Sequence, residues 1–188
     1  MFRLILFFSL FPIAIALAAR WWFGIRILTS DGKRTCRCDL NRWLPLPGDD
    51  AIVHRAEESA SEFGRQLRLK AMAKWKADQP KSANSRESSR RFGSIVPPLS
   101  GVIAVMAVLV GRVPIIGAVA ILFGATALSA VMGLLSLPAE LTIISRAALK
   151  AREDKLFPNR DDEDAVIRCA IAHAWEASLP SILRLIHR

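Results

Sequence analysis

Long uncharged stretches alternate with strongly charged ones along this chain. Residues 4–19 form an uncharged run of 16, residues 95–111 one of 17, and residues 113–139 one of 27. A helix that crosses a bilayer needs about 20 mainly apolar residues, each adding 1.5 Å. The pattern therefore predicts three membrane-spanning helices, near residues 4–23, 95–111 and 114–138.

The second and third runs are separated only by Arg112. The sequence Gly-Arg-Val-Pro at 111–114 is typical of a turn, so we expect the two runs to form a helical hairpin. An uncharged run of 27 residues rarely occurs in the core of a soluble protein.

The first run is open to two interpretations. Arg3, the apolar stretch and the Ala-Leu-Ala at 16–18 also fit a cleavable signal peptide. Arg20 and the Trp21–Trp22 pair directly after that cleavage site, together with the later spans, favour an uncleaved helix with an interfacial anchor.

The remaining segments are polar or mixed. Alternation predicts a short strand at Thr35–Leu40, and apolar residues at every third or fourth position predict a helix over about Asp50–Lys76, capped by Asp49 or Asp50. The polar, serine-rich stretch Asp78–Arg91 is typical of a mobile linker. The apolar tail at 165–186 is interrupted by charges, so it favours an interfacial amphipathic helix over a fourth span.

These elements predict a mainly α integral membrane protein with a small, mostly helical cytoplasmic domain. We expect an N-terminal span at 1–23, a basic domain with its linker at 24–94, the hairpin at 95–139, and C-terminal cytoplasmic or interfacial helices at 140–188.

Composition and charge support this organisation. The 188 residues are 52% hydrophobic and 23% charged, which excludes a disordered chain, and the net charge is +9. Sixteen Lys and Arg against nine Asp and Glu lie between residues 20 and 91, whereas the hairpin turn carries only Arg112. The positive-inside rule then places the basic segment and the tail in the cytoplasm, at the inner (plasma) membrane, although Arg3 on the far side disagrees. Three cysteines give no complete disulfide framework, in keeping with a reducing compartment.

Two segments carry a resemblance to a known family. Residues 137–149 read LPAELTIISRAAL, and residues 51–58 read AIVHRAEE. The first is similar to the Leu-Pro-x-Glu-Phe-x-Ala-Ser-Arg-Arg-Ala-Leu segment of the bacterial membrane-bound neutral zinc metallopeptidases (YugP-like), with one residue inserted. The second is similar to the Val-Ala-Ala-His-Glu-x-x-His helix of that family. The resemblance covers roughly residues 32–188.

The resemblance implies a zinc site, and this chain departs from it at the reactive positions. His54 matches the first zinc ligand and Glu140 the third, whereas Glu58 replaces the second histidine. Arg55 stands where the family has the glutamate that activates water, and arginine stays protonated and cannot act as a general base. We therefore expect an inactive relative that acts as a binding or regulatory module. The alternatives are an active zinc peptidase with the ligands His54, Glu58 and Glu140, and a basic module that binds the membrane surface.

Glu140 and Arg55 carry two further expectations. We expect the Glu140 side chain to point into the helix of the soluble domain and not into lipid. On an inherited scaffold, the Arg55 guanidinium would then replace the charge of the metal by pairing with Glu58 or Glu140. A solvent-exposed Arg55 without a stable partner is the alternative.

Other motifs in the sequence are weaker indications of function. Cys36 and Cys38 could bind a thiophilic metal with His54 but are typical of buried strand thiols, and Cys169 and His173 are typical of packing residues. No phosphate-binding loop or G-x-S-x-G motif occurs. The expected partners are the lipid bilayer, anionic headgroups and another membrane protein; nucleic acid is not expected, because topology accounts for the basic excess.

Overall fold

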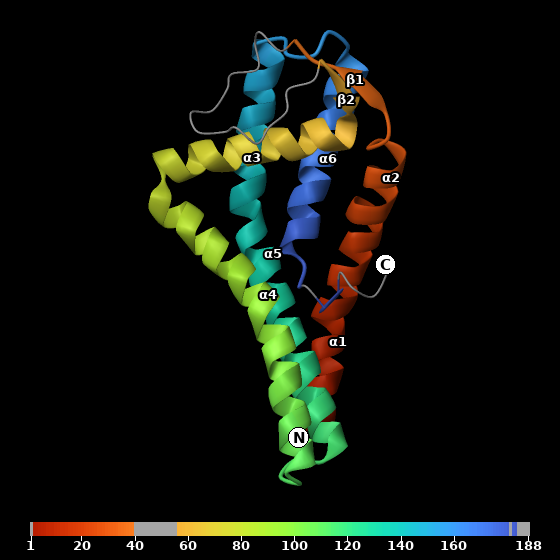
Figure 1. The fold of residues 1–188 in the computed structure, drawn as a ribbon, viewed down its shortest axis with the longest axis vertical. Coiled ribbons are helices and arrows are strands. Elements are labelled where there is room, and N and C mark those ends of the chain that lie inside the picture. The colour runs from red at the N-terminus through yellow and green to blue at the C-terminus, as the bar shows by residue number, and fades with distance from the viewer. Residues whose placement is uncertain (1, 40–55, 181, 184–188) are drawn as a thin grey trace. The chain divides into compact units, whose positions relative to one another are not determined.

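The computed structural model describes residues 2–39, 56–180 and 182–183, and this part of the chain is mainly helical, as expected (Figure 1). In chain order the elements are α1 (Phe2–Ala19), the π-helix η1 (Arg20–Ile27), α2 (Leu28–Ser30), β1 (Thr35–Arg37), β2 (Glu57–Ser59), α3 (Ala60–Asp78), α4 (Pro80–Leu109), α5 (Ile115–Glu153) and α6 (Arg160–Ser178).

The described residues form two compact units. The first takes its residues from 1–20, 84–138 and 177–188, and the second from 21–83 and 139–176. Each unit therefore combines segments that are distant in sequence.

The first unit contains the expected hairpin. The residues between α4 and α5 turn through Gly111, whose φ of +72° is a conformation that favours glycine. A Cβ on Gly101 would lie 3.6 Å from Leu122, so the two helices pack side by side. On the other side of α5, a Cβ on Gly124 would lie 3.5 Å from Ile5 of α1. Small residues thus let the helices of this unit approach closely.

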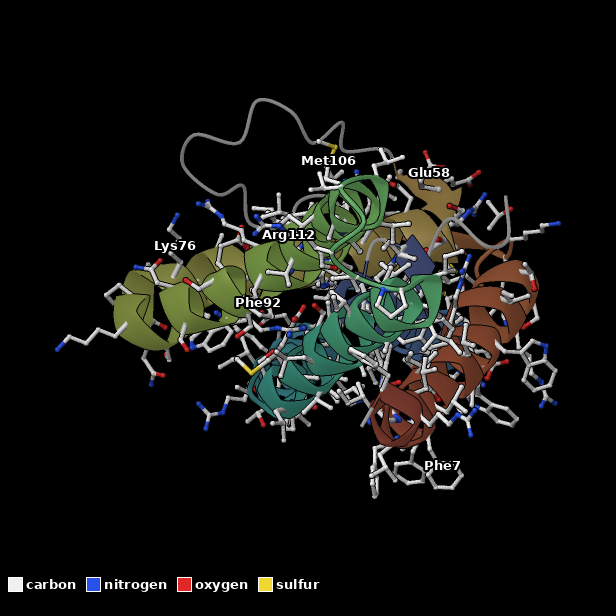
Figure 2. The ribbon with its side chains drawn as sticks, turned by 90° about the horizontal axis from the view of Figure 1, so that it is seen from below. Phe7, Glu58, Lys76, Phe92, Met106 and Arg112 are labelled. Atoms are coloured by element: carbon white, nitrogen blue, oxygen red, sulfur yellow. The ribbon has the colours of Figure 1, made fainter. Side chains whose placement is uncertain are left out.

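Three stretches of the described chain have the length and apolar composition of membrane spans: Phe2–Ser30, Pro80–Leu109 and Ile115–Glu153. Their outward faces are strongly hydrophobic. Phe7 is 71% exposed, and Figure 2 shows its ring pointing away from α1. Met106 on α4 is 56% exposed, and Figure 2 shows it on the outer side of that helix. Such continuous apolar surface is unusual for a soluble monomer and is typical of contact with lipid.

The expectation of a mobile linker at Asp78–Arg91 is wrong, because α4 begins at Pro80 and continues without a break to Leu109. Proline suits the first turn of a helix, where its missing N–H has no helical partner. Within the first unit, the buried Arg86 side chain donates hydrogen bonds to the Gly133 carbonyl oxygen at 3.1 Å and to Ser178 Oγ at 2.5 Å, and it also contacts Ser136 Oγ. These contacts connect the polar N-terminal part of α4 to Gly133, Ser136 and Ser178 of the same unit.

The expected helix from Asp50 is also wrong in its described N-terminal part. Glu57–Ser59 is the strand β2, which pairs antiparallel with β1 in the register Thr35–Ser59, Cys36–Glu58 and Arg37–Glu57. The strand expected at Thr35–Leu40 is confirmed over Thr35–Arg37. The helix begins only at Ala60, and its cap is Ser59, whose Oγ accepts a hydrogen bond from the Glu62 N–H at 3.2 Å. Asp49 and Asp50, the expected caps, lie outside the described residues.

In the second unit, α3 packs against α6 at a point of close approach. A Cβ on Gly64 would lie 2.7 Å from the Ala170 nitrogen and 2.7 Å from the Cys169 Cβ, so only glycine fits there. Val166, Cys169 and Ala170 of α6 are fully buried. The tail is helical in its described part, as α6, and buried residues of α6 pack against α3. Its expected interfacial position stays a prediction.

Candidate functional site

A fully buried carboxylate of the second unit forms an ion pair between α5 and α3. Arg68 Nε lies 2.6 Å from Glu140 Oε1, with Glu140 fully buried and Arg68 9% exposed. The Glu140 side chain was expected to point toward the helix predicted upstream, and its contact with α3 confirms this direction. A charge-assisted hydrogen bond of this length is among the stronger polar interactions in a protein interior.

Local sequence explains why Arg68 faces inward. Phe63, Leu67, Ala71 and Trp75 form the buried stripe of α3, and Arg68 lies within the same face of the helix. Ser59 and Glu62 fix the start of the helix and therefore its register along this face. A guanidinium inside an apolar stripe needs an internal partner, since an unpaired buried charge costs several kcal/mol, of the order of 3–5.

Glu58 does not occupy the position expected of a zinc ligand on a helix. It lies in the strand β2 and not on a helix, half-buried and opposite Cys36. His54 and Arg55 lie outside the described residues. The expected pairing of Arg55 with Glu58 or Glu140 therefore stays a prediction, whereas Arg68 is a partner of Glu140 that the sequence analysis missed.

Within residues 2–39 and 56–183, as far as these are described, no three side chains of His, Cys, Asp or Glu gather in a way that could hold a metal ion. A zinc ion bound to Glu140 would also lie a few Å from the Arg68 guanidinium, and two positive charges at that distance repel. Among the described residues, the Glu140 carboxylate is thus paired with a guanidinium.

The three cysteines are free and buried. Burial raises the pKa of the Cys36 and Cys38 thiols to about 11 each, and that of Cys169 to about 12. Thiolate is the form that binds metals and attacks electrophiles, so burial disfavours both reactions here. This agrees with the interpretation of these residues as packing residues.

His173 of α6 contacts the start of α3. Its Nε2 lies 3.1 Å from Ser61 Oγ and 3.1 Å from the Ser61 carbonyl oxygen, and its Nδ1 lies 3.9 Å from Glu176 Oε2. A serine, a histidine and a carboxylate in this order suggest a nucleophile and its base. The tautomer decides the hydrogen bond: a protonated Nε2 donates to the Ser61 carbonyl oxygen, whereas an unprotonated Nε2 accepts from the Ser61 hydroxyl. The contact joins α6 to α3.

No protein-family model, curated protein or solved structure matches the chain. The resemblance to the YugP-like metallopeptidases therefore stays a prediction from the two motifs.

Burial of His173 predicts a pH-dependent stability. Desolvation, together with the nearby positive charges of Arg68 and Arg65, lowers the pKa of the imidazole below its usual value, although Ser61 and Glu176 act in the opposite direction. Below about pH 6.5 the unfolded chain therefore takes up a proton before the folded chain does, and stability falls as the pH falls.

Thermal unfolding of the detergent-solubilised chain between pH 8 and pH 5 measures this effect. We expect the melting temperature to fall more steeply in the wild type than in His173→Gln, which removes the titrating group. The difference between the two curves isolates His173 from the other histidines. Parallel curves for the two proteins would contradict the prediction.

Proposed function

We propose that this chain is a multi-pass protein of the inner membrane that acts as a binding or regulatory module on a metallopeptidase-like scaffold without peptidase activity. The observation that supports the loss of activity is the Arg68–Glu140 pair. The carboxylate that would be the third zinc ligand has a permanent cation 2.6 Å away. With Arg55 in place of the general base, the scaffold would lack both the metal charge and the group that activates water.

The membrane location is supported by length, composition and exposure. Three helical stretches meet the length and polarity of a span, and their exposed residues include Phe7, Leu109 and Ile115 at 71%, 75% and 73%. The cytoplasmic orientation of residues 20–91 is proposed from charge, because 16 Lys and Arg lie in that segment and the hairpin turn has only Arg112.

Zinc content and peptidase activity test the proposed loss of catalysis. The full chain, purified in a neutral detergent without chelators, is analysed by elemental mass spectrometry and incubated with casein and with a fluorogenic peptide library. We expect less than stoichiometric zinc and no hydrolysis above that of a mock purification. One zinc per chain that is lost in both His54→Ala and Glu140→Ala, with activity lost in parallel, would instead establish the active peptidase with atypical ligands.

Labelling of introduced cysteines tests the topology. Ser88 is exposed at the start of α4, and Arg112 lies in the hairpin turn. The three native thiols are buried and have raised pKa values, so they react slowly. We expect Ser88→Cys to react with an impermeant maleimide only after the cells are opened, and Arg112→Cys to react in intact spheroplasts. Labelling of both positions from the same side would reject the hairpin topology.

A further inference from the structure

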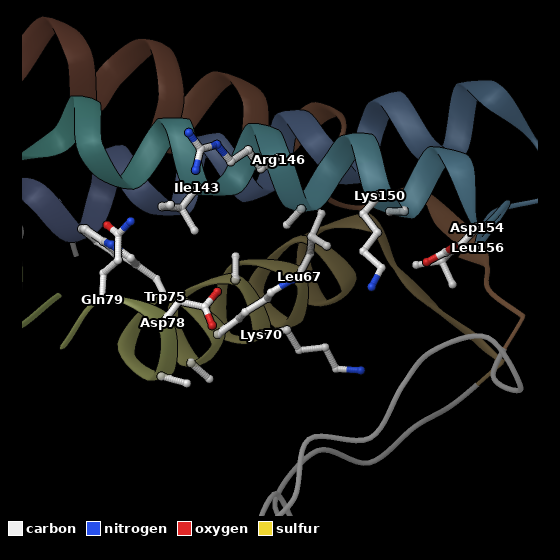
Figure 3. Close-up of a pocket in the computed structure, with 16 residues that line it drawn as sticks. Leu67, Lys70, Trp75, Asp78, Gln79, Ile143, Arg146, Lys150, Asp154 and Leu156 are labelled. Atoms are coloured by element: carbon white, nitrogen blue, oxygen red, sulfur yellow. The ribbon is translucent and has the colours of Figure 1, made fainter. Parts of the chain in front are cut away.

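A groove of about 600 Å³ runs between α3 and the C-terminal part of α5 within the second unit. Figure 3 shows Leu67 and Trp75 rising from α3 and Ile143 reaching toward them from α5. Together with Ala71 and Ala147 these residues make an apolar floor. The volume lies within the range of about 300–1,000 Å³ that is usual for sites of small organic ligands.

The rim of the groove is predominantly cationic. Lys70 and Lys74 stand one helical turn apart on α3, and Arg146 and Lys150 stand one turn apart on α5. Each pair therefore lies along one side of the groove, and Lys150 projects into the space between the helices (Figure 3). Asp78 and Asp154 are the acidic residues that line it, so the four cations exceed the acids by two.

The place of the groove in the chain brings it close to the proposed membrane boundary. Ile143 follows the last residue of the uncharged run 113–139 by four positions, and α5 is helical throughout. At 1.5 Å per residue, the groove begins about 6 Å along the helix from the end of that run. Phospholipids are the most concentrated amphiphiles at such a boundary.

We propose that this groove binds an anionic phospholipid, with part of an acyl chain on the apolar floor and the phosphate among Lys74, Arg146 and Lys150. The combination of an apolar floor with a cationic rim complements a molecule that has an apolar chain and a negative head. The proposal deepens the proposed role as a binding module and rests on the membrane location. It commits to lipid, because the groove begins four residues past the uncharged run 113–139 and carries a net positive charge.

Lipid-dependent thermal stability of the full chain tests the proposal. The purified protein in dodecyl maltoside is titrated with palmitoyl-oleoyl phosphatidylglycerol or with the corresponding zwitterionic phosphatidylcholine. The groove variant is Lys74→Gln/Arg146→Gln/Lys150→Gln. The control variant Lys33→Gln/Lys76→Gln/Lys81→Gln removes the same charge from exposed positions that do not line the groove.

We expect phosphatidylglycerol to raise the melting temperature of the wild type and of the control variant more than phosphatidylcholine does. The groove variant should lose this difference, with binding weakened by about five-fold for each cation removed. If phosphatidylglycerol raises the melting temperature of all three proteins equally, the anionic headgroup binds outside the groove, and the proposal is overturned. Equal shifts with the two lipids in the wild type would do the same.

Two further measurements address the floor and the identity of the occupant. Ala147→Trp fills the groove while leaving every rim charge in place, and it should lower phosphatidylglycerol binding with little change in the melting temperature without lipid. A photoreactive benzophenone amino acid at Ile143, irradiated in native membranes, should gain the mass of one phospholipid. Crosslinking mainly to a second copy or to another protein would overturn the lipid assignment and favour a docked helix.

Failure of the lipid proposal can be distinguished from failure of the proposed function. The tests for zinc, hydrolysis and labelling do not depend on groove residues. If those tests give the expected results but the chain shows no preference for phosphatidylglycerol, only the proposal of a lipid site is overturned.

Discussion

A fully buried carboxylate is costly unless it is paired, and in this protein that constraint joins α3 to α5. Glu140 is fully buried, and Arg68 supplies the cation at 2.6 Å. Once this pair is made, Leu67 and Trp75 face α5 beside it, and Gly64 is brought against α6. The ion pair therefore joins α3 to α5, the same two helices that line the groove.

A buried ion pair is not by itself a source of great stability, because removing two charges from water costs much of what their attraction returns. Its main effect is on specificity: any arrangement of α3 that separates the two groups leaves a buried charge unpaired. Arg86 is the buried cation of the first unit, and its guanidinium donates to neutral acceptors, the Gly133 carbonyl oxygen and the Ser178 hydroxyl. In both units an arginine holds together segments that are distant in sequence.

The sequence predicted the long apolar elements well and the polar ones poorly. The hairpin was predictable because 27 uncharged residues after a Gly-Arg-Val-Pro turn have few alternatives. The helix at Pro80 was not, since its first three turns are polar and are held by Arg86, whose partners Gly133 and Ser178 are 47 and 92 residues away. The strand at Glu57–Ser59 was missed because apolar spacing was extended across it, although Ser59 and Glu62 form the Ser-x-x-Glu pattern that marks the true helix start.

The candidate site was half predictable. The direction of the Glu140 side chain was predicted from its position directly after the apolar run, whereas its partner Arg68 was not. Arg68 carried a usable signal, a charge within the apolar stripe of a helix, which indicates a buried partner. The contact between His173 and Ser61 joins residues 112 positions apart and leaves no local pattern. Burial and long-range pairing of this kind follow from tertiary packing and not from local spacing.

A double-mutant cycle on Arg68 and Glu140 tests the central claim most directly. We predict that Arg68→Met and Glu140→Leu each destabilise the detergent-solubilised chain by about 3–5 kcal/mol, and that the double variant recovers most of this loss. A chelator should leave the losses of both single variants unchanged. The exposed pair Arg65–Glu62 is the matched control, and its cycle should give about 1 kcal/mol or less. Additive losses at Arg68 and Glu140, or a wild-type stability that falls when zinc is removed, would contradict the account.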